Sequence, residues 1–129
     1  QHLNTHPHQG VSLIGHSGGG ALAALMAARM PEVDQVVTLA GNLDIAAWAN
    51  LHRYTRLKDS LNPADVNLIH TKQLHFGGDR DKNVPPSLGA AWLNSMRQTM
   101  HIIKDADHNC CWLTHWNQIL TQIDQQMTP

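Results

Sequence analysis

The sequence predicts an α/β fold in which helices flank a parallel sheet. Short apolar runs bounded by glycine or asparagine alternate along the chain with longer segments that have helical spacing. This alternation is typical of strands that are buried on both faces and joined by crossover helices. The chain has 129 residues, 42% of them hydrophobic, which fits one domain with its own core. No internal repeat or linker is visible, so we expect residues 1–129 to form a single domain.

Two strands and one helix are expected in the first part of the chain. Val11–Ile14 is a short apolar run that ends at a glycine, and Val36–Ala40 is the next run of this kind. Between them, Gly18–Met30 is rich in alanine, leucine and methionine and is closed by Pro31, as expected of a helix. These segments predict one strand–helix–strand unit.

The middle of the chain continues the alternation after an irregular stretch. Asp44–Leu61 has no clean period, and we expect a long excursion that contains some helix. Asn62–Asp65 combines a capping asparagine, a proline and an acid, which predicts a helix start. Gln73–Phe76 and Met100–Lys104 predict two more strands, with a helix over Ser87–Met100 between them.

The last helix has the clearest period, because its apolar residues recur at helical spacing on one face. The members of this face are Trp112, Trp116, Ile119, Leu120, Ile123 and Met127.

Charge and hydropathy exclude several functions. With 9 Lys and Arg against 10 Asp and Glu, the net charge is -1, and no basic run indicates binding to nucleic acid or an anionic membrane. The longest apolar stretch, Ala21–Ala28, is far too short for a transmembrane helix. The chain starts at Gln1 without a methionine or a signal-type segment, so we expect a processed chain, a truncated one, or a piece of a longer one.

The strongest chemical signal is the segment Gly15–Gly20, which reads Gly-His-Ser-Gly-Gly-Gly. Its Gly-x-Ser-x-Gly pattern follows an expected strand and opens an expected helix, which is the setting of a nucleophile elbow. A serine in such a turn has a strained backbone and needs small neighbours, which Gly15, Gly18 and Gly19 provide. The turn would expose the Ser17 hydroxyl and place the Gly18 N–H at a helix N-terminus, where it can stabilise an oxyanion.

Other interpretations of this turn remain open. Gly18–Ala23 fits the loose dinucleotide-binding pattern Gly-x-Gly-x-x-Ala, and a glycine-rich turn can also be purely structural. A nucleotide-binding domain would use an acid near the end of the second strand, such as Asp44, to contact a ribose. A phosphate-binding loop of the Gly-Lys-Ser/Thr type is excluded because Ala21 follows Gly20.

Residues for the rest of a hydrolase site follow later strands. A hydrolase with this elbow needs a serine, an acid and a histidine in that chain order. Gly77–Pro85 supplies acids, Asp105–His108 supplies a histidine, and each segment follows an expected strand. Because the carboxyl ends of parallel strands meet at one edge of a sheet, Ser17, an aspartate and His108 can converge there.

With these motifs, the chain resembles the C-terminal half of an α/β-hydrolase from about Val11 to Met127. In that family the acid lies in a segment written Gly-x-x-Asp-x-x-Val-Pro. Here this segment is Gly78–Pro85, which selects Asp81 over Asp79.

The resemblance also implies the chemistry. Ser17 would attack a carboxylic ester or related acyl substrate, and His108, between the last strand and the last helix, would take its proton. Asp81 would orient the imidazole, the Gly18 N–H would bind the oxyanion, and water would cleave the acyl-enzyme without a cofactor. Asp44 is the alternative acid, because some α/β-hydrolases place the acid after the preceding strand.

A narrower resemblance concerns the cellular location. Gly41–Asp44 with Trp48, Ser60–Pro63 and His108–Trp112 are similar to segments of a group of little-characterised bacterial α/β-hydrolases. Many of these are exported, often with lipoprotein-type signals. This favours the periplasm or the cell envelope and leaves the cytoplasm open.

The chain departs from the family before the elbow. The family's sheet has several earlier strands, and a loop among them supplies a second oxyanion donor and part of the pocket. We therefore expect a partial α/β-hydrolase fold in which Val11–Ile14 is an open edge that can pair with another chain. A non-catalytic fragment or interaction module, which needs a partner chain or the missing half, is the alternative to an enzyme.

The remaining residues of chemical interest are the histidines, the tryptophans and the two cysteines. The chain has ten histidines, but no HExxH and no zinc-ligand spacing, so we expect no metal. We expect His16, beside the serine, and Trp48, in the irregular excursion, to line a substrate pocket. Adjacent cysteines rarely form an unstrained disulfide, so we expect Cys110 and Cys111 to pack, or one of them to bond with a cysteine outside the chain.

Overall fold

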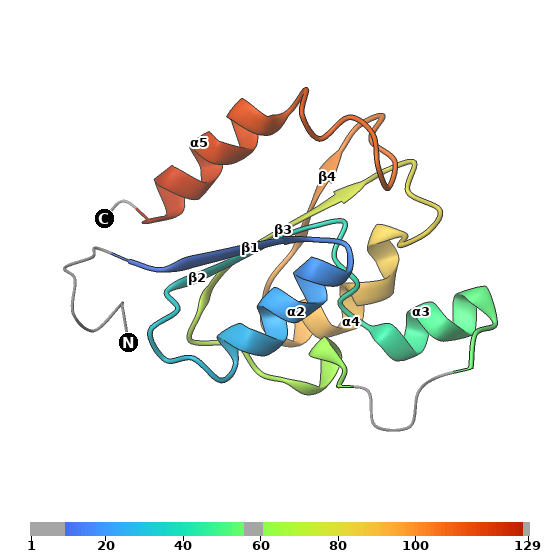
Figure 1. Cartoon of the computed structure of the whole chain (residues 1–129), viewed down its shortest axis with the longest axis horizontal. Helices are drawn as coiled ribbons and strands as arrows, with labels where there is room; N and C mark the ends of the chain where they lie inside the picture. The colour runs from blue at the N-terminus through green and yellow to red at the C-terminus, as the bar shows by residue number, and fades with distance from the viewer. Residues whose placement is uncertain (1–9, 56–60, 128–129) are drawn as a thin grey trace.

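The computed structural model describes residues 10–55 and 61–127, which form a four-stranded parallel sheet with helices on both faces (Figure 1). The strands lie in chain order, and each is paired in parallel with the next. They are β1 (Ser12–His16), β2 (Gln35–Leu39), β3 (Lys72–Gly78) and β4 (Met100–Ile103). The strands expected from the apolar runs are confirmed, with ends displaced by one or two residues.

The helices form a layer on each face of the sheet. In Figure 1, α5 lies on one side of the sheet and α2 and α4 lie on the other. The helices are α2 (Gly18–Ala27), α3 (Ile45–His52), α4 (Ala90–Ser95) and α5 (Trp116–Met127). α3 is the helical part of the excursion expected over Asp44–Leu61, of which residues 56–60 lie outside the described residues. This arrangement confirms the predicted fold class.

Two apolar cores fill the spaces between the layers. All five residues of β2 are buried, and alternate side chains point to opposite faces. Val36 packs with Ala24 of α2 and Leu93 of α4, whereas Val37 packs in the other core with Ile119 of α5. The central strands are therefore held on both faces, which fixes the positions of the residues at their carboxyl ends.

A neutral histidine is buried within the sheet. Gln73 donates from Nε2 to the Leu68 carbonyl at 2.9 Å, so its Oε1 accepts from His75 Nε2–H, also at 2.9 Å. His75 Nδ1 then accepts from the Thr38 hydroxyl at 2.7 Å. Burial, with a smaller contribution from His101, lowers the pKa of His75 from 6.5 to about 4. The imidazole is thus uncharged in the folded chain at neutral pH.

Two expected helices are shorter in the structure. The helix expected over Ser87–Met100 is a 3-10 turn followed by the short α4, and Arg97 just beyond it has φ 57°. The helix start expected at Asn62–Asp65 gives a single 3-10 turn. It ends because Val66 returns to extended backbone, where its carbonyl accepts from the Trp92 indole N–H at 2.8 Å.

The last helix begins at Trp116 rather than at Trp112. Residues 112–115 form turns instead, in which the N–H groups of His115 and Trp116 donate to carbonyls three residues earlier. Trp112 is nevertheless buried, in the same core as α5. Leu120 is 38% exposed and lies at the margin of the expected apolar face, and the side chain of Met127 lies outside the described residues.

β1 is an open edge of the sheet. Among the described residues this strand pairs with β2 on one side, and Ile14 on it is 45% exposed. Leu22 and Met26 of the adjoining α2 are also exposed. The open edge expected at Val11–Ile14 is therefore present in the described part of the chain, and a partner for it stays a prediction.

Candidate active site

The turn between β1 and α2 presents Ser17 at the carboxyl edge of the sheet. Ser17 has φ 57° and ψ −122°, a conformation that costs a residue other than glycine about 1–3 kcal/mol. Backbone hydrogen bonds hold it there. The Ser17 N–H donates to the Leu39 carbonyl at 2.9 Å, and the Ser17 carbonyl accepts from the N–H groups of Gly20 and Ala21. The backbone that carries the hydroxyl is thus held between the end of β1 and the start of α2.

Only some of the glycines around Ser17 are required by close contacts in the turn. A Cβ on Gly15 would lie 2.1 Å from the Gly19 carbonyl oxygen, and one on Gly20 would lie 2.9 Å from Gly41 Cα. A Cβ on Gly18 or Gly19 would meet nothing within 4 Å. The expectation of a steric need at Gly18 and Gly19 is therefore wrong, because both are exposed, whereas Gly20 lies where α2 crosses the chain after β2.

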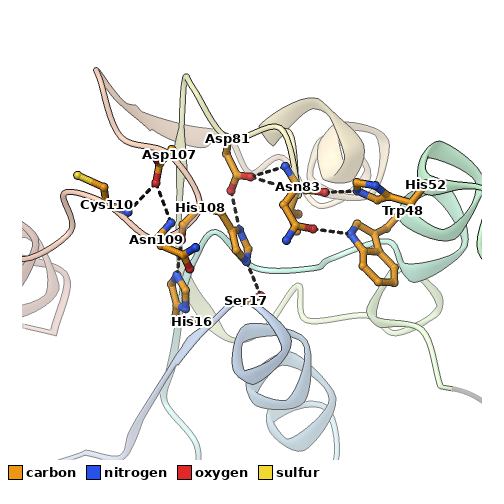
Figure 2. A network of polar contacts seen from close by, with 11 residues as sticks. His16, Ser17, Trp48, His52, Asp81, Asn83, Asp107, His108, Asn109 and Cys110 are labelled. Atoms are coloured by element: carbon orange, nitrogen blue, oxygen red, sulfur yellow. Dashed lines mark hydrogen bonds and ion pairs between the residues drawn. The ribbon is translucent and has the colours of Figure 1, made fainter.

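The structure brings Ser17, His108 and Asp81 together in one chain of hydrogen bonds (Figure 2). Ser17 Oγ lies 2.8 Å from His108 Nε2, and His108 Nδ1 lies 2.9 Å from Asp81 Oδ2. A carboxylate only accepts, so Nδ1 carries a hydrogen and donates to Asp81. In the neutral imidazole, Nε2 is then left to accept from the Ser17 hydroxyl. The three residues follow β1, β4 and β3, as the convergence argument expected.

Asp81 is held by its own loop. Its carboxylate is buried, and Oδ1 accepts from the N–H groups of Asn83 at 2.9 Å and Val84 at 2.7 Å. These two donors leave Oδ2 for His108. The loop therefore sets the direction in which the carboxylate meets the imidazole.

The other candidate acids have different partners. Asp44 caps α3, where its Oδ1 accepts from Ala47 N–H and from the Asn62 side chain, both at 3.1 Å. Asp79 accepts from Asp105 N–H at 2.7 Å. Of the acids weighed from the sequence, Asp81 is thus the one that contacts the histidine.

The loop that follows His108 is closed by a turn and a disulfide. Asp107 Oδ1 accepts from the N–H groups of Cys110 and Asn109, and these bonds lower the pKa of Asp107. Cys110 and Cys111 are bonded to each other. The expectation that they pack, or bond outside the chain, is therefore wrong. Cys111 takes φ 131°, a turn conformation that lets the two sulfurs meet.

His16 and Trp48 lie on opposite sides of the Ser17–His108 pair in Figure 2. His16 donates from Nε2 to the His108 carbonyl at 2.8 Å and lines a hollow of about 320 Å³. Trp48 donates from its indole N–H to Asn83 Oδ1 at 3.2 Å. Both residues therefore lie near the site, and substrate contact by either one stays a prediction.

Asn83 connects the acid loop to α3, a role that sequence reasoning missed. Its N–H donates to Asp81, its carbonyl accepts from His52 Nε2–H at 2.6 Å, and its side chain accepts from Trp48. The signal that could have found Asn83 is its place two residues after an aspartate, where a side chain commonly accepts a backbone N–H. No local signal indicated His52.

The described residues contain neither a cluster that could hold a metal ion nor a helix that could span a membrane. In the described parts of the chain, no three histidine, cysteine, aspartate or glutamate side chains gather to hold a metal ion. Among the same residues, no helix combines the length and apolar character needed to cross a bilayer.

The similar solved structures include esterases and other hydrolases, whereas no family model and no curated protein matches the sequence. One is the esterase domain of a Rhodothermus marinus protein, with 26% identity and a TM-score of 0.57 over 76% of this chain and 50% of that one. A bifunctional acetyl ester-xyloside hydrolase from Caldicellulosiruptor lactoaceticus has 17% identity and a TM-score of 0.62 over 88% and 55%. An alpha-beta serine hydrolase homologue from Coxiella burnetii has 17% identity and a TM-score of 0.57 over 92% and 48%.

These comparisons establish the fold. The chain has part of the α/β-hydrolase fold, and it spans about half the length of these three structures. The partial fold expected from the sequence is therefore confirmed. Any proposal about the reaction and the substrate of this chain has to be argued from the geometry of the candidate site.

Proposed function

We propose that this chain carries the catalytic residues of a serine hydrolase that cleaves carboxylic esters or related acyl compounds. The observation that supports this best is the unbroken hydrogen-bond chain from Ser17 through His108 to Asp81. A serine hydroxyl, a neutral imidazole and a buried carboxylate in this order are what nucleophilic acyl transfer requires. The esterases among the solved structures of this fold add support.

The proposed reaction has two half-reactions. Ser17 Oγ bonds to the carbonyl carbon while its proton passes to His108 Nε2, and Asp81 stabilises the imidazolium. His108 then gives this proton to the leaving alcohol oxygen, which produces the acyl-enzyme and a free alcohol. Water attacks the acyl-enzyme with His108 as base, releases the carboxylic acid and restores the Ser17 hydroxyl.

We assign the first oxyanion donor to the Gly18 N–H. This group lies in the first turn of α2, where amides have no acceptor within the helix and the helix dipole is positive. A second donor is expected from a segment that pairs beyond β1. Loss of one such donor costs about 10²–10³ in rate, so slow turnover is expected from the chain on its own.

The open edge of β1 favours a second candidate function, an interaction module that needs a partner chain. Ile14 is exposed on this edge, and unpaired backbone groups of an edge strand are a template for another strand. In this alternative the chain supplies half of a sheet, and pairing through Val11–Ile14 is its main activity.

Turnover of a p-nitrophenyl ester by the parent and by two serine variants tests the proposal. Ser17→Ala should reduce hydrolysis to the background rate while circular dichroism stays unchanged, because the turn tolerates a small residue. Ser87→Ala, at an exposed position before α4, is the matched control and should keep the parent rate. If the Ser17→Ala chain hydrolyses the ester as fast as the parent, the proposal fails. A folded parent without turnover would favour the interaction module.

A further inference from the structure

The peptide group between Asn83 and Val84 is hydrogen-bonded at both of its ends. Its N–H belongs to Val84 and donates to Asp81 Oδ1 at 2.7 Å. Its carbonyl belongs to Asn83 and accepts from His52 Nε2–H at 2.6 Å (Figure 2). This peptide bond is trans, so its N–H and its carbonyl point in opposite directions. His52 and Asp81 therefore lie at the two ends of one rigid, planar group.

The hydrogen bond from His52 affects Asp81 in two ways. It restrains rotation of the peptide plane, and this plane sets the direction in which the Val84 N–H meets Oδ1. It also polarises the peptide group, which makes that N–H a stronger donor. The Asn83 N–H, which donates to the same oxygen at 2.9 Å, belongs to the preceding peptide. Hydrogen bonds thus continue from His52 through this peptide to Asp81, whose other oxygen bonds to His108.

The imidazole of His52 is held in place by its neighbours. Trp48 lies one turn earlier on the same face of α3, and its indole N–H donates to Asn83 Oδ1 at 3.2 Å. The centroid of the His52 ring lies 5.4 Å from that of Trp48 and 5.4 Å from that of Tyr54, and the His52 side chain is half-buried. α3 therefore meets the acid loop at both the side chain and the carbonyl of Asn83.

We propose that His52 is a positioning residue for Asp81, and that α3 takes part in the reaction through this contact. This inference rests on the proposed serine hydrolase function. The tautomer of an imidazole is set by the hydrogen bonds of its two nitrogens, and Asp81 holds the hydrogen of His108 on Nδ1. Loss of the His52 bond frees the peptide and loosens the carboxylate. The hydrogen of His108 can then move to Nε2, where it prevents transfer of the Ser17 proton.

Two substitutions of His52 test this role by kinetics. In His52→Leu, kcat for a p-nitrophenyl ester should fall about fivefold with KM unchanged, which corresponds to one net hydrogen bond in the transition state. His52→Gln keeps an N–H donor of similar reach and should recover most of this loss. His70→Leu, at an exposed position before β3 on the opposite edge of the sheet, is the matched control and should keep the parent rate. Parent kcat in a folded His52→Leu chain, or an equal loss in His52→Gln, would overturn the proposal.

A measurement of the His108 tautomer keeps this inference distinguishable from the proposed function. Nitrogen NMR of the histidine-labelled chain reports which ring nitrogen carries the hydrogen, and the signals of His108 are identified by their loss in His108→Gln. The hydrogen should lie on Nδ1 in the parent and in His52→Gln, and should move in part to Nε2 in His52→Leu. An unchanged tautomer in His52→Leu overturns the inference even if the parent hydrolyses the ester. A changed tautomer in a chain whose parent hydrolyses no ester would support positioning by His52 and count against the hydrolase.

Discussion

Replacing Asp81 by asparagine would reverse the hydrogen bond between this residue and His108. Asp81 Oδ1 accepts from Asn83 N–H at 2.9 Å and from Val84 N–H at 2.7 Å. In the variant, only the amide oxygen can accept these two bonds. The amide NH₂ must then occupy the position of Oδ2, which lies 2.9 Å from His108 Nδ1. The two backbone donors therefore fix the direction of the amide.

This direction selects the wrong tautomer of His108. A donating NH₂ requires Nδ1 to accept, so the imidazole hydrogen moves to Nε2, which lies 2.8 Å from Ser17 Oγ. Nε2 can then no longer take the serine proton. We expect kcat for a p-nitrophenyl ester to fall about 10⁴-fold in Asp81→Asn, while the circular dichroism spectrum stays that of the parent.

Asp79→Asn is the matched control for this experiment. It makes the same chemical change two residues away, at a side chain that accepts from Asp105 N–H and has no bond to the histidine. This variant should keep the parent rate. If folded Asp81→Asn stays within about tenfold of the parent, Asp81 does not set the tautomer and the reasoning is refuted.

The glycine turn, the buried histidine and the disulfide each give a further prediction. Gly15→Ala places a Cβ 2.1 Å from a carbonyl oxygen and should lower the free energy of unfolding in urea by more than about 3 kcal/mol. Gly19→Ala, with nothing within 4 Å, should change it by less than about 1 kcal/mol. The pKa of His75 is lowered from 6.5 to about 4 in the folded chain. Between these two pH values the unfolded chain binds a proton at His75 and the folded chain does not, which favours unfolding. Stability should therefore fall by about 2 kcal/mol from pH 7 to pH 5 in urea titrations, and His75→Gln should remove this loss. Reduction of Cys110–Cys111 by dithiothreitol should slow ester turnover, because it frees the loop after His108, and Cys110→Ser should be slow with and without the reductant.

Each of these predictions has a contradicting result. A Gly15→Ala chain as stable as Gly19→Ala would show that the turn has more room than its backbone indicates. A free energy of unfolding that is equal at pH 7 and pH 5 would mean that His75 is not buried as a neutral group. Equal ester turnover before and after reduction would show that the disulfide does not influence the candidate site.

The strands were predictable because each contains a short run in which apolar residues dominate. In β2, Val36, Val37 and Leu39 form this run, and the two polar residues, Gln35 and Thr38, are buried with them. The start of α5 was not predictable in this way. Trp112 is buried with the apolar face of α5, as the period indicates, but residues 112–115 form turns with bonds between residues three apart, and a pattern of apolar side chains does not distinguish such turns from a helix.

The candidate site was predictable where chemistry lies in local segments. The chain order of serine, acid and histidine, with the resemblance of Gly78–Pro85 to the acid segment of α/β-hydrolases, was enough to select the residues that the structure brings together. Their catalytic role stays a prediction. The contacts that hold them were not predictable, because they join distant segments. The Leu39 carbonyl meets Ser17, and Asn83 meets His52, only after the sheet has formed.

The central claim is that the hydroxyl of Ser17 is an activated nucleophile. Labelling of the chain with a fluorophosphonate, followed by peptide mass spectrometry, tests it most directly. The Ser17–His108–Asp81 hydrogen bonds predict one adduct, on Ser17, which forms in the parent and is lost in His108→Gln. A folded parent that gives no adduct on Ser17, or an adduct that forms equally fast in His108→Gln, would contradict the account.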